Sequence, residues 1–541
     1  MKKRFLPFSF FVSLMALAVV LNGFSLYDGG KTNADNPSKS VQEAFKSAAY
    51  LHALKTNQKT GLLNPQWAVA ADEQTDLMAS SRSADEIGWS VMGPDNFGGR
   101  TRAIIYDNKD ASGLTVYAGA VSGGLWRSTD NAVTWTKINT GNQNLYVSCM
   151  TQADDGTIYV GTGEAFDAGM YSQLGQLGYS NGFMGTGIYK STDGENFELI
   201  ESTKPQVNSA DGDWAYINAI QVDGNGTLYA ATNTGLKYSD DNGATWKIAK
   251  DDQGDELLEN AYDVEVAGSS VIAAVNNECY TSSGDAGQFV NHSTGEAGQL
   301  PVGDGVRRIE LAVAPSDNNI VYASLVNNNG YVKGIYRSDN FGDSWEVILP
   351  ETNSVNIFWG GGEYYNALTV FPDDPDRVLL GGYNLWQGIK TNDNGLFYWE
   401  QKSSSFFPYS SDYLGRMSHV FVFRPGHPKQ FLAGTSEGIF KGEYSGEDYT
   451  FKSANLKYYT TQFYRVANSG IGNYVIAGAQ ENGYLKMTSE SNSPGYATQI
   501  ISGYGCDGAV SLINPDVIVF SLPTGYISVR RIEVKTFLPS F

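Results

Sequence analysis

One phrase recurs along this chain, from about Gly88 to near its end. Each copy has an apolar strand, a turn of small residues with Gly, and then Gly, an apolar residue, an aromatic residue and Lys or Arg. The clearest copies read VYAGAVSGGLWRS, LYAATNTGLKYS, FLAGTSEGIFKG and VIAGAQENGYLK. A sequence that repeats at such intervals folds by packing one unit against the next, because a single unit cannot bury its own apolar face.

The repeat predicts a β-propeller. It yields about nine units of roughly 40 to 60 residues, each with about four short strands. A solenoid would have shorter and more uniform repeats, a sandwich would not repeat itself, and no helices alternate with the strands. We therefore expect an all-β propeller with about nine four-stranded units over residues 88–541. They would form one large ring, or a seven-bladed ring plus a partial second ring.

A second motif follows several copies of the phrase. Its fullest form is YSDDNGATWKIA, Tyr238 to Ala249, which gathers acids, Asn and Gly like a calcium loop. With Gly243 at the sixth position of such a loop, Tyr238 and Ala249 stand where the first and last ligands belong, and neither supplies a carboxylate. The alternative is a turn, in which Ser and Asp accept backbone N–H bonds and Gly takes the left-handed conformation.

The motif S-x-D-x-G-x-T-W is similar to the Asp-box, or BNR repeat, of a β-propeller family. The chain most resembles exported bacterial glycosyl-hydrolase-like and sortilin-like propellers, over about residues 88–531. The resemblance implies that each box is a turn between the third and outermost strands, with its Trp packed between blades. The matching residues are Ser128, Asp130, Trp135, Ser239, Asp241, Gly243, Thr245, Trp246, Ser338, Gly342 and Trp345.

The first 87 residues differ from the rest. A basic start and an apolar run from Phe5 to Leu21 predict a signal peptide over residues 1–25, with an uncleaved membrane anchor as the alternative. Residues 26–87 read as a helix and a linker. We expect a secreted or cell-surface protein. Trp89 stands where a box Trp would, so residues near 88–92 resemble an outermost strand that could complete the last blade. A relative truncated at its C-terminus is a second interpretation of the chain's extent.

The composition excludes several functions. A net charge of −21 argues against nucleic acid and against strong affinity for a membrane surface, because both partners are anionic. The three cysteines are too far apart for a disulfide framework or a zinc pattern, although a single bridge stays open. The four histidines share no ligand spacing. We therefore predict no metal and no cofactor.

The turns between second and third strands are the expected ligand face, opposite the boxes. They carry carboxylates and aromatic residues, and unit two has a long insertion there, a common sign of function. Packing at the tops of the blades is the alternative for each residue. The weak catalytic candidates are Glu164, Glu437, Glu481 and Asp507, and the ligand-binding candidates are Tyr171, Tyr179, Trp359, Tyr383 and Trp386.

Two functions fit these residues. The favoured hypothesis is an exported module that binds a polysaccharide or protein ligand, since aromatic, amide and carboxylate side chains suit both. The alternative is a glycoside hydrolase with paired carboxylates. Two features of the resemblance count against hydrolysis. Val121 stands where xyloglucan-hydrolysing relatives have a catalytic Asp, and Arg100 and Arg102 are not equivalent to the arginines of sialidases.

Overall fold

The computed structural model describes most of the chain from residue 91 to residue 531. The described residues are 59, 74, 91–140, 145–164, 183–205, 212–303, 305–352, 355–391, 396–405, 408, 410–446, 448–470, 472–488, 495–522 and 527–531. The expected signal peptide, and all but two residues of the expected helix and linker, lie outside them. Within the described residues, no helix has the length and apolarity to cross a membrane.

The described strands form nine sheets, each built from consecutive stretches of chain. Blades 1 to 3 consist of β1 (Thr101–Tyr106), β2 (Val116–Ala120), β3 (Gly124–Ser128), β4 (Thr136–Lys137), β5 (Val147–Gln152), β6 (Ile158–Thr162), β7 (Ile188–Ser191), β8 (Glu198–Leu199), β9 (Ile217–Val222), β10 (Leu228–Thr232), β11 (Gly235–Ser239) and β12 (Lys247–Ile248). A short 3-10 helix, η3 (Glu201–Thr203), follows β8.

Blades 4 and 5 follow the same plan. Their strands are β13 (Lys250–Asp251), β14 (Ala261–Ala267), β15 (Ser270–Val275), β16 (Glu278–Ser283), β17 (Gln288–Asn291), β18 (Arg308–Val313), β19 (Val321–Val326), β20 (Val332–Ser338) and β21 (Glu346–Pro350). Blade 4 has a fifth strand because β13 pairs in parallel with β17.

Blades 6 and 7 complete a ring, and a second module follows them. Their strands are β22 (Ala367–Phe371), β23 (Asp374–Gly381), β24 (Leu385–Lys390), β25 (Phe397–Gln401), β26 (Ser418–Arg424), β27 (His427–Thr435), β28 (Gly438–Tyr444) and β29 (Tyr449–Ser453). The second module consists of β30 (Phe463–Asn468), β31 (Tyr474–Ala479), β32 (Gly483–Thr488), β33 (Ala497–Ile501), β34 (Gly508–Val510), β35 (Val517–Ser521) and β36 (Ile527–Arg531).

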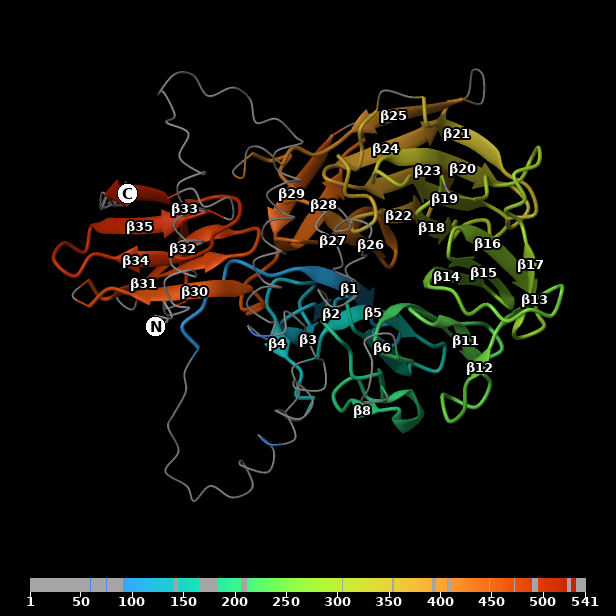
Figure 1. Cartoon of the computed structure of the whole chain (residues 1–541), viewed down its shortest axis with the longest axis horizontal. Helices are drawn as coiled ribbons and strands as arrows, with labels where there is room; N and C mark the ends of the chain where they lie inside the picture. The colour runs from blue at the N-terminus through green and yellow to red at the C-terminus, as the bar shows by residue number, and fades with distance from the viewer. Residues whose placement is uncertain are drawn as a thin grey trace, which may run out of the picture.

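Seven blades close into a ring. The innermost strands β1, β5, β9, β14, β18, β22 and β26 contact one another in that order, and β26 contacts β1. The second module, with one four-stranded and one three-stranded sheet, lies beside blades 1 and 7 (Figure 1). The all-β propeller prediction is therefore confirmed, and of the two arrangements left open by the sequence the chain adopts a seven-bladed ring plus a partial second one.

The described chain before β1 joins the second module to the ring. The backbone N–H of Asp95 donates to the carbonyl of Gly495 at 2.8 Å, and the amide of Asn96 exchanges two hydrogen bonds with the backbone of Ala497. Phe97 packs into the apolar cluster between β31 and β32. Residues 91–100 form no strand, and residues 88–90 of the expected closing strand lie outside the described residues. Among the described residues, each blade of the ring is built from consecutive strands, and no strand from before β1 completes blade 7.

The S-x-D turns have the geometry that their residues dictate. Ser239 Oγ accepts a hydrogen bond from the N–H of Gly243 at 2.9 Å, and Asp241 accepts bonds from the N–H and hydroxyl of Thr245. Gly243 has φ of +85°, a left-handed conformation that an L side chain disfavours. Ser128 with Asp130, and Ser338 with its neighbour Asn340, repeat the arrangement.

The tryptophans after these turns pack between blades. Trp135 of blade 1 donates its indole N–H to the carbonyl of Ala454 in blade 7 at 2.7 Å, and its ring contacts that of Tyr458. Trp345 packs among residues of blades 4 and 5. Trp246 packs against the apolar cluster of blades 2 and 3, where its ring lies 4.7 Å from that of Trp214 between centroids. Each of these tryptophans therefore packs against side chains outside its own turn, at the boundary between two blades.

Candidate functional site

The predicted ligand face carries a cluster of buried charges. In each blade the turn between the second and third strands, and the segment that enters the innermost strand, share one face; we call it the top face. The S-x-D turns lie on the opposite face, because successive antiparallel strands end at alternate edges. Three of the four carboxylate candidates, Glu164, Glu437 and Glu481, are buried on the top face.

Glu164 follows β6 and faces the start of β1. Its carboxylate accepts a hydrogen bond from Arg100 at 2.6 Å and lies 3.7 Å from Arg102. The hydroxyl of Tyr364, in the segment before β22, also donates to it. Both guanidinium groups stand over the Tyr364 ring, and His419 meets that ring edge-on. The carboxylate of Glu164 is thus held by blades 1 and 6.

Glu437 has the same kind of surroundings at the turn between β27 and β28. Arg416 lies 3.3 Å from one of its oxygens, and the hydroxyl of Tyr413 donates to the other. Burial raises the pKa of Glu437 above its ordinary value, and Arg416 opposes that shift. A buried carboxylate is stable only with such partners, so Arg416 and Tyr413 account for its place in the fold.

Glu481 comes from the second module and meets the ring. It lies on the turn between β31 and β32, is 4% exposed, and has an oxygen with no hydrogen-bond partner among the described residues. Burial raises the pKa of Glu481 to about 7, even though Arg416 lowers it. Glu437 and Arg100 also act on this carboxyl. Two ion pairs, Arg100 with Glu164 and Arg416 with Glu437, thus lie on this face, and Glu481 of the second module is within electrostatic range of Arg416, Glu437 and Arg100; we call these five side chains the charged network.

The aromatic candidates lie at the rim of this network. Trp359 stacks on Tyr383 with ring centroids 4.9 Å apart and planes 9° from parallel. Tyr383 is buried and Trp359 and Trp386 are half-buried, all in or against the apolar cluster of blades 5 and 6. Tyr171 and Tyr179 lie outside the described residues. Asp507 is exposed at the start of the last sheet and takes no part in the network.

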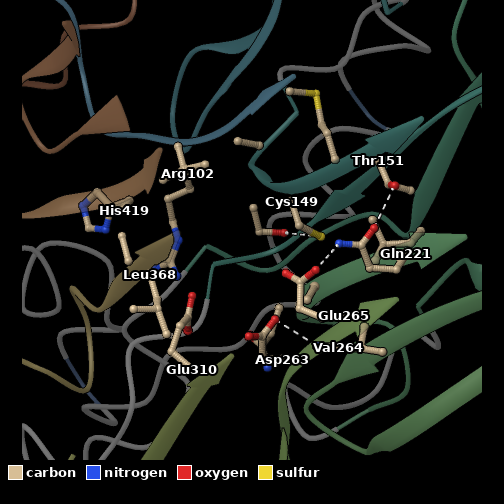
Figure 2. A pocket seen from close by; sticks show the side chains of 18 of the residues that line it. Arg102, Cys149, Thr151, Gln221, Asp263, Val264, Glu265, Glu310, Leu368 and His419 are labelled. Atoms are coloured by element: carbon tan, nitrogen blue, oxygen red, sulfur yellow. Dashed lines mark hydrogen bonds between the residues drawn. The ribbon is translucent and has the colours of Figure 1, made fainter. Parts of the chain in front are cut away.

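Below the network, the ring encloses a channel. Its cavity volume is about 530 Å³, and residues of all seven innermost strands line it. Figure 2 shows Gln221 of β9 between two neighbours: Thr151 donates to its carbonyl, and its amide donates to Glu265, both at 3.1 Å. The volume lies within the range of roughly 300–1,000 Å³ that small-ligand sites occupy.

The channel concentrates acids on two neighbouring strands. Asp263 and Glu265 alternate along β14, and Glu310 accepts a hydrogen bond from Arg308 on β18. Burial, with Glu310 as the next cause, raises the pKa of Glu265 to about 8, and burial also raises the pKa of Asp263 and Glu310. Burial, Arg102 and Arg100 lower the pKa of His419 on the opposite side, so the imidazole is neutral. At neutral pH the channel therefore holds protonated carboxyls that can donate hydrogen bonds.

Of the residues that line the channel, Glu164 was a candidate in the sequence, but the acids of β14 and β18 were not. Their signal is present in YDVEVA and RRIELAV, where polar and charged residues alternate within an apolar strand. In an ordinary sheet this alternation indicates that one side faces solvent. Only the closed ring reveals that the polar side of these strands lines a channel. Arg416, the ion-pair partner of Glu437, likewise has no feature in its local sequence that connects it to that acid.

The described residues include acids, histidines and all three cysteines of the chain. They contain no group of three or more His, Cys, Asp and Glu side chains arranged to hold a metal ion. Cys149, Cys279 and Cys506 are free thiols. Burial raises the pKa of Cys149 to about 12 and that of Cys506 to about 11, so neither is a thiolate at neutral pH.

Comparisons with known proteins define the class as a β-propeller. No protein-family model and no curated protein matches the chain. An ancestral GH74 enzyme is similar in structure, with a TM-score of 0.58 and 17% identity over 83% of this chain and 62% of that one. A GH74 xyloglucanase from Xanthomonas campestris has a TM-score of 0.55 and 16% identity, over 80% and 65%. A GH74 enzyme from Niastella koreensis has a TM-score of 0.51 and 17% identity, over 80% and 73%.

These likenesses are distant in sequence and show the fold. The chain spans 62% and 65% of the length of the first two enzymes. The features that characterise this protein are therefore its own: a seven-bladed ring, a second module of two sheets, and the charged network between them.

Proposed function

We propose that this protein is an exported module that binds a carbohydrate or protein ligand on the top face, over the mouth of the channel. One observation carries the choice of binding over hydrolysis. Glu164 is buried with both of its oxygens bonded to Arg and Tyr partners, and Glu437 is buried with one oxygen bonded to Tyr413 and the other 3.3 Å from Arg416. A hydrolytic pair needs carboxylates that reach the glycosidic oxygen and the sugar carbon.

A hydroxyl-rich ligand suits the channel best. Amides, hydroxyls and protonated carboxyls line it, and these groups both donate and accept hydrogen bonds. The xyloglucanase named above, which has a similar fold, acts on a polysaccharide by its name. A peptide is the second ligand class.

Hydrolysis is the alternative function, and one observation favours it. Glu481, with a pKa of about 7, lies near Glu437, so one acid can be protonated while its neighbour is ionised. That is the division of roles that a glycosidase requires.

A screen for binding and hydrolysis of polysaccharides separates the two functions. We expect the mature protein to retain a polysaccharide in affinity electrophoresis and to release no reducing sugar. Gln221→Ala should weaken binding roughly tenfold, because it removes an amide that lines the channel and the two hydrogen bonds that hold Thr151 and Glu265 in place there. Gln253→Ala, at an exposed position, is the matched control. Hydrolysis that Glu481→Gln abolishes would establish the alternative instead.

A further inference from the structure

A groove on blade 5 is separate from the channel. It has a cavity volume of about 320 Å³ and shares no lining residue with the channel. Its walls are the turn from β19 to β20, the end of β21 and the chain just before Trp359. The lining residues are Asn327, Tyr331, Val332, Leu349, Pro350, Glu351, Val355 and Asn356. It opens on the top face, because the turn between the second and third strands forms one wall.

The wall that carries Tyr331 is rigid. Asn327 Oδ1 accepts hydrogen bonds from the N–H groups of Asn329 and Tyr331, which fixes the turn. Gly330 has φ of +77°, and a Cβ there would come within 2.2 Å of the carbonyl oxygen of Gly360. The N–H of Gly362 also donates to the carbonyl of Gly330 at 3.0 Å. The turn and the loop at 357–362 therefore hold each other in place.

Tyr331 presents an aromatic surface on this rigid wall. Its side chain is 43% exposed, although a tyrosine in a folded chain usually buries most of its ring. An exposed ring on a fixed backbone loses little conformational entropy when a ligand packs on it. The ring is thus preorganised as a contact surface.

The polar groups beside Tyr331 leave the groove without net charge. Glu351 accepts hydrogen bonds from Lys333 at 2.9 Å and Asn327 at 3.1 Å, and these bonds lower the pKa of Glu351. The carboxylate is therefore ionised at neutral pH and offset by the ammonium. It keeps lone pairs for further donors. Asn356 is exposed, and its Oδ1 accepts the N–H of Trp359 at 2.9 Å.

We infer that this groove is a second, peripheral subsite that binds a neutral saccharide. This inference rests on the proposed function. An aromatic face, a carboxylate acceptor and a carboxamide on the rim match the C–H face and hydroxyls of a pyranose ring. A charged peptide would find no unbalanced charge here. The volume, at the lower end of the range for ligand sites, suits a short stretch of a longer chain that extends from the channel mouth.

Calorimetric titration of the full chain tests the subsite. The probes are cellohexaose, mannohexaose, a xyloglucan oligosaccharide and a proline-rich decapeptide. For the saccharide that binds, we expect Tyr331→Ala to lower the affinity roughly tenfold and Tyr331→Phe to change it less than about threefold, because the ring face makes the contact. Glu351→Ala should also weaken binding. Tyr398→Ala, at a 58% exposed tyrosine on β25, is the matched control and should leave the affinity unchanged.

The outcomes separate the subsite from the proposed function. If Gln221→Ala weakens saccharide binding but neither Tyr331→Ala nor Glu351→Ala does, the subsite is wrong and the proposed function stands. If only the decapeptide binds and Tyr331→Ala abolishes its binding, the saccharide class is wrong. If no probe binds the wild type, both proposals fail. Circular dichroism of each variant distinguishes a lost contact from a lost fold.

Discussion

Glu481 is the acid of the charged network that comes from the second module. Charges buried in a protein are tolerated when they are paired, and Glu164 and Glu437 each have an arginine partner. Burial raises the pKa of Glu481 to about 7, so this carboxyl is protonated at mildly acidic pH. The residue thus makes the junction between the ring and the second module sensitive to pH.

Glu481→Gln should flatten the pH dependence of stability. The folded-state pKa of about 7 lies above the unfolded value near 4.5, so the proton stabilises the folded state below pH 4.5 and that contribution is lost as pH rises to 7. The difference amounts to roughly 3 kcal/mol for a group this buried. Denaturant unfolding at pH 4.5, 5.5, 6.5 and 7.5 measures it. Glu346→Gln, at an exposed position on β21, should parallel the wild type. A constant difference between wild type and Glu481→Gln would contradict the prediction.

At the scale of elements, the S-x-D turns hold neighbouring blades together. Local sequence predicts the turn well, because its hydrogen bonds run between residues two to four positions apart. Local sequence does not predict which residues the Trp contacts. Trp135 contacts blade 7, whose strands lie about three hundred residues later in the chain. The resemblance implied packing between blades, and the structure places Trp135 where the ring closes.

Trp135→Ala should weaken the closure of the ring. Trp135 is 3% exposed and bonds to Ala454, so its removal leaves a cavity and costs about 3–5 kcal/mol. Hydrogen exchange should increase in β1–β4 and β26–β29, and remain near wild type in β14–β17. Val347→Ala, at a 48% exposed residue on β21, is the control. A uniform increase over all seven blades would show that Trp135 has no special part in closure.

At the scale of the molecule, the second module docks through a few buried side chains. Tyr504, which precedes β34, belongs to the same apolar cluster as Tyr365 and Tyr383 of the ring. The segment at 95–97 adds a second connection to β33. The module therefore has its own sheets but shares part of its core with the ring.

Tyr504→Ala should make the module unfold apart from the ring. Tyr504 is 5% exposed, and its loss removes its own contacts with the ring without touching the core within the module. Scanning calorimetry should show one transition for the wild type and a second, lower one for the variant. Tyr496→Ala, at a 55% exposed tyrosine of the same module, should keep the wild-type profile. A single transition at a lower temperature for Tyr504→Ala would mean that the two parts stay coupled.

The sequence by itself determined the blades. Strand alternation, glycine turns and the S-x-D motif are local, and local hydrogen bonds form in the same way wherever the unit sits. Only the tertiary structure decided that seven blades close while two sheets remain outside. That choice depends on the contact of β1 with β26, which lie far apart in the chain. The same reason applies to the site: Glu164, Glu437 and Glu481 were visible as residues, but the partners of Glu164 come from blades 1 and 6, and only the closed ring brings them together.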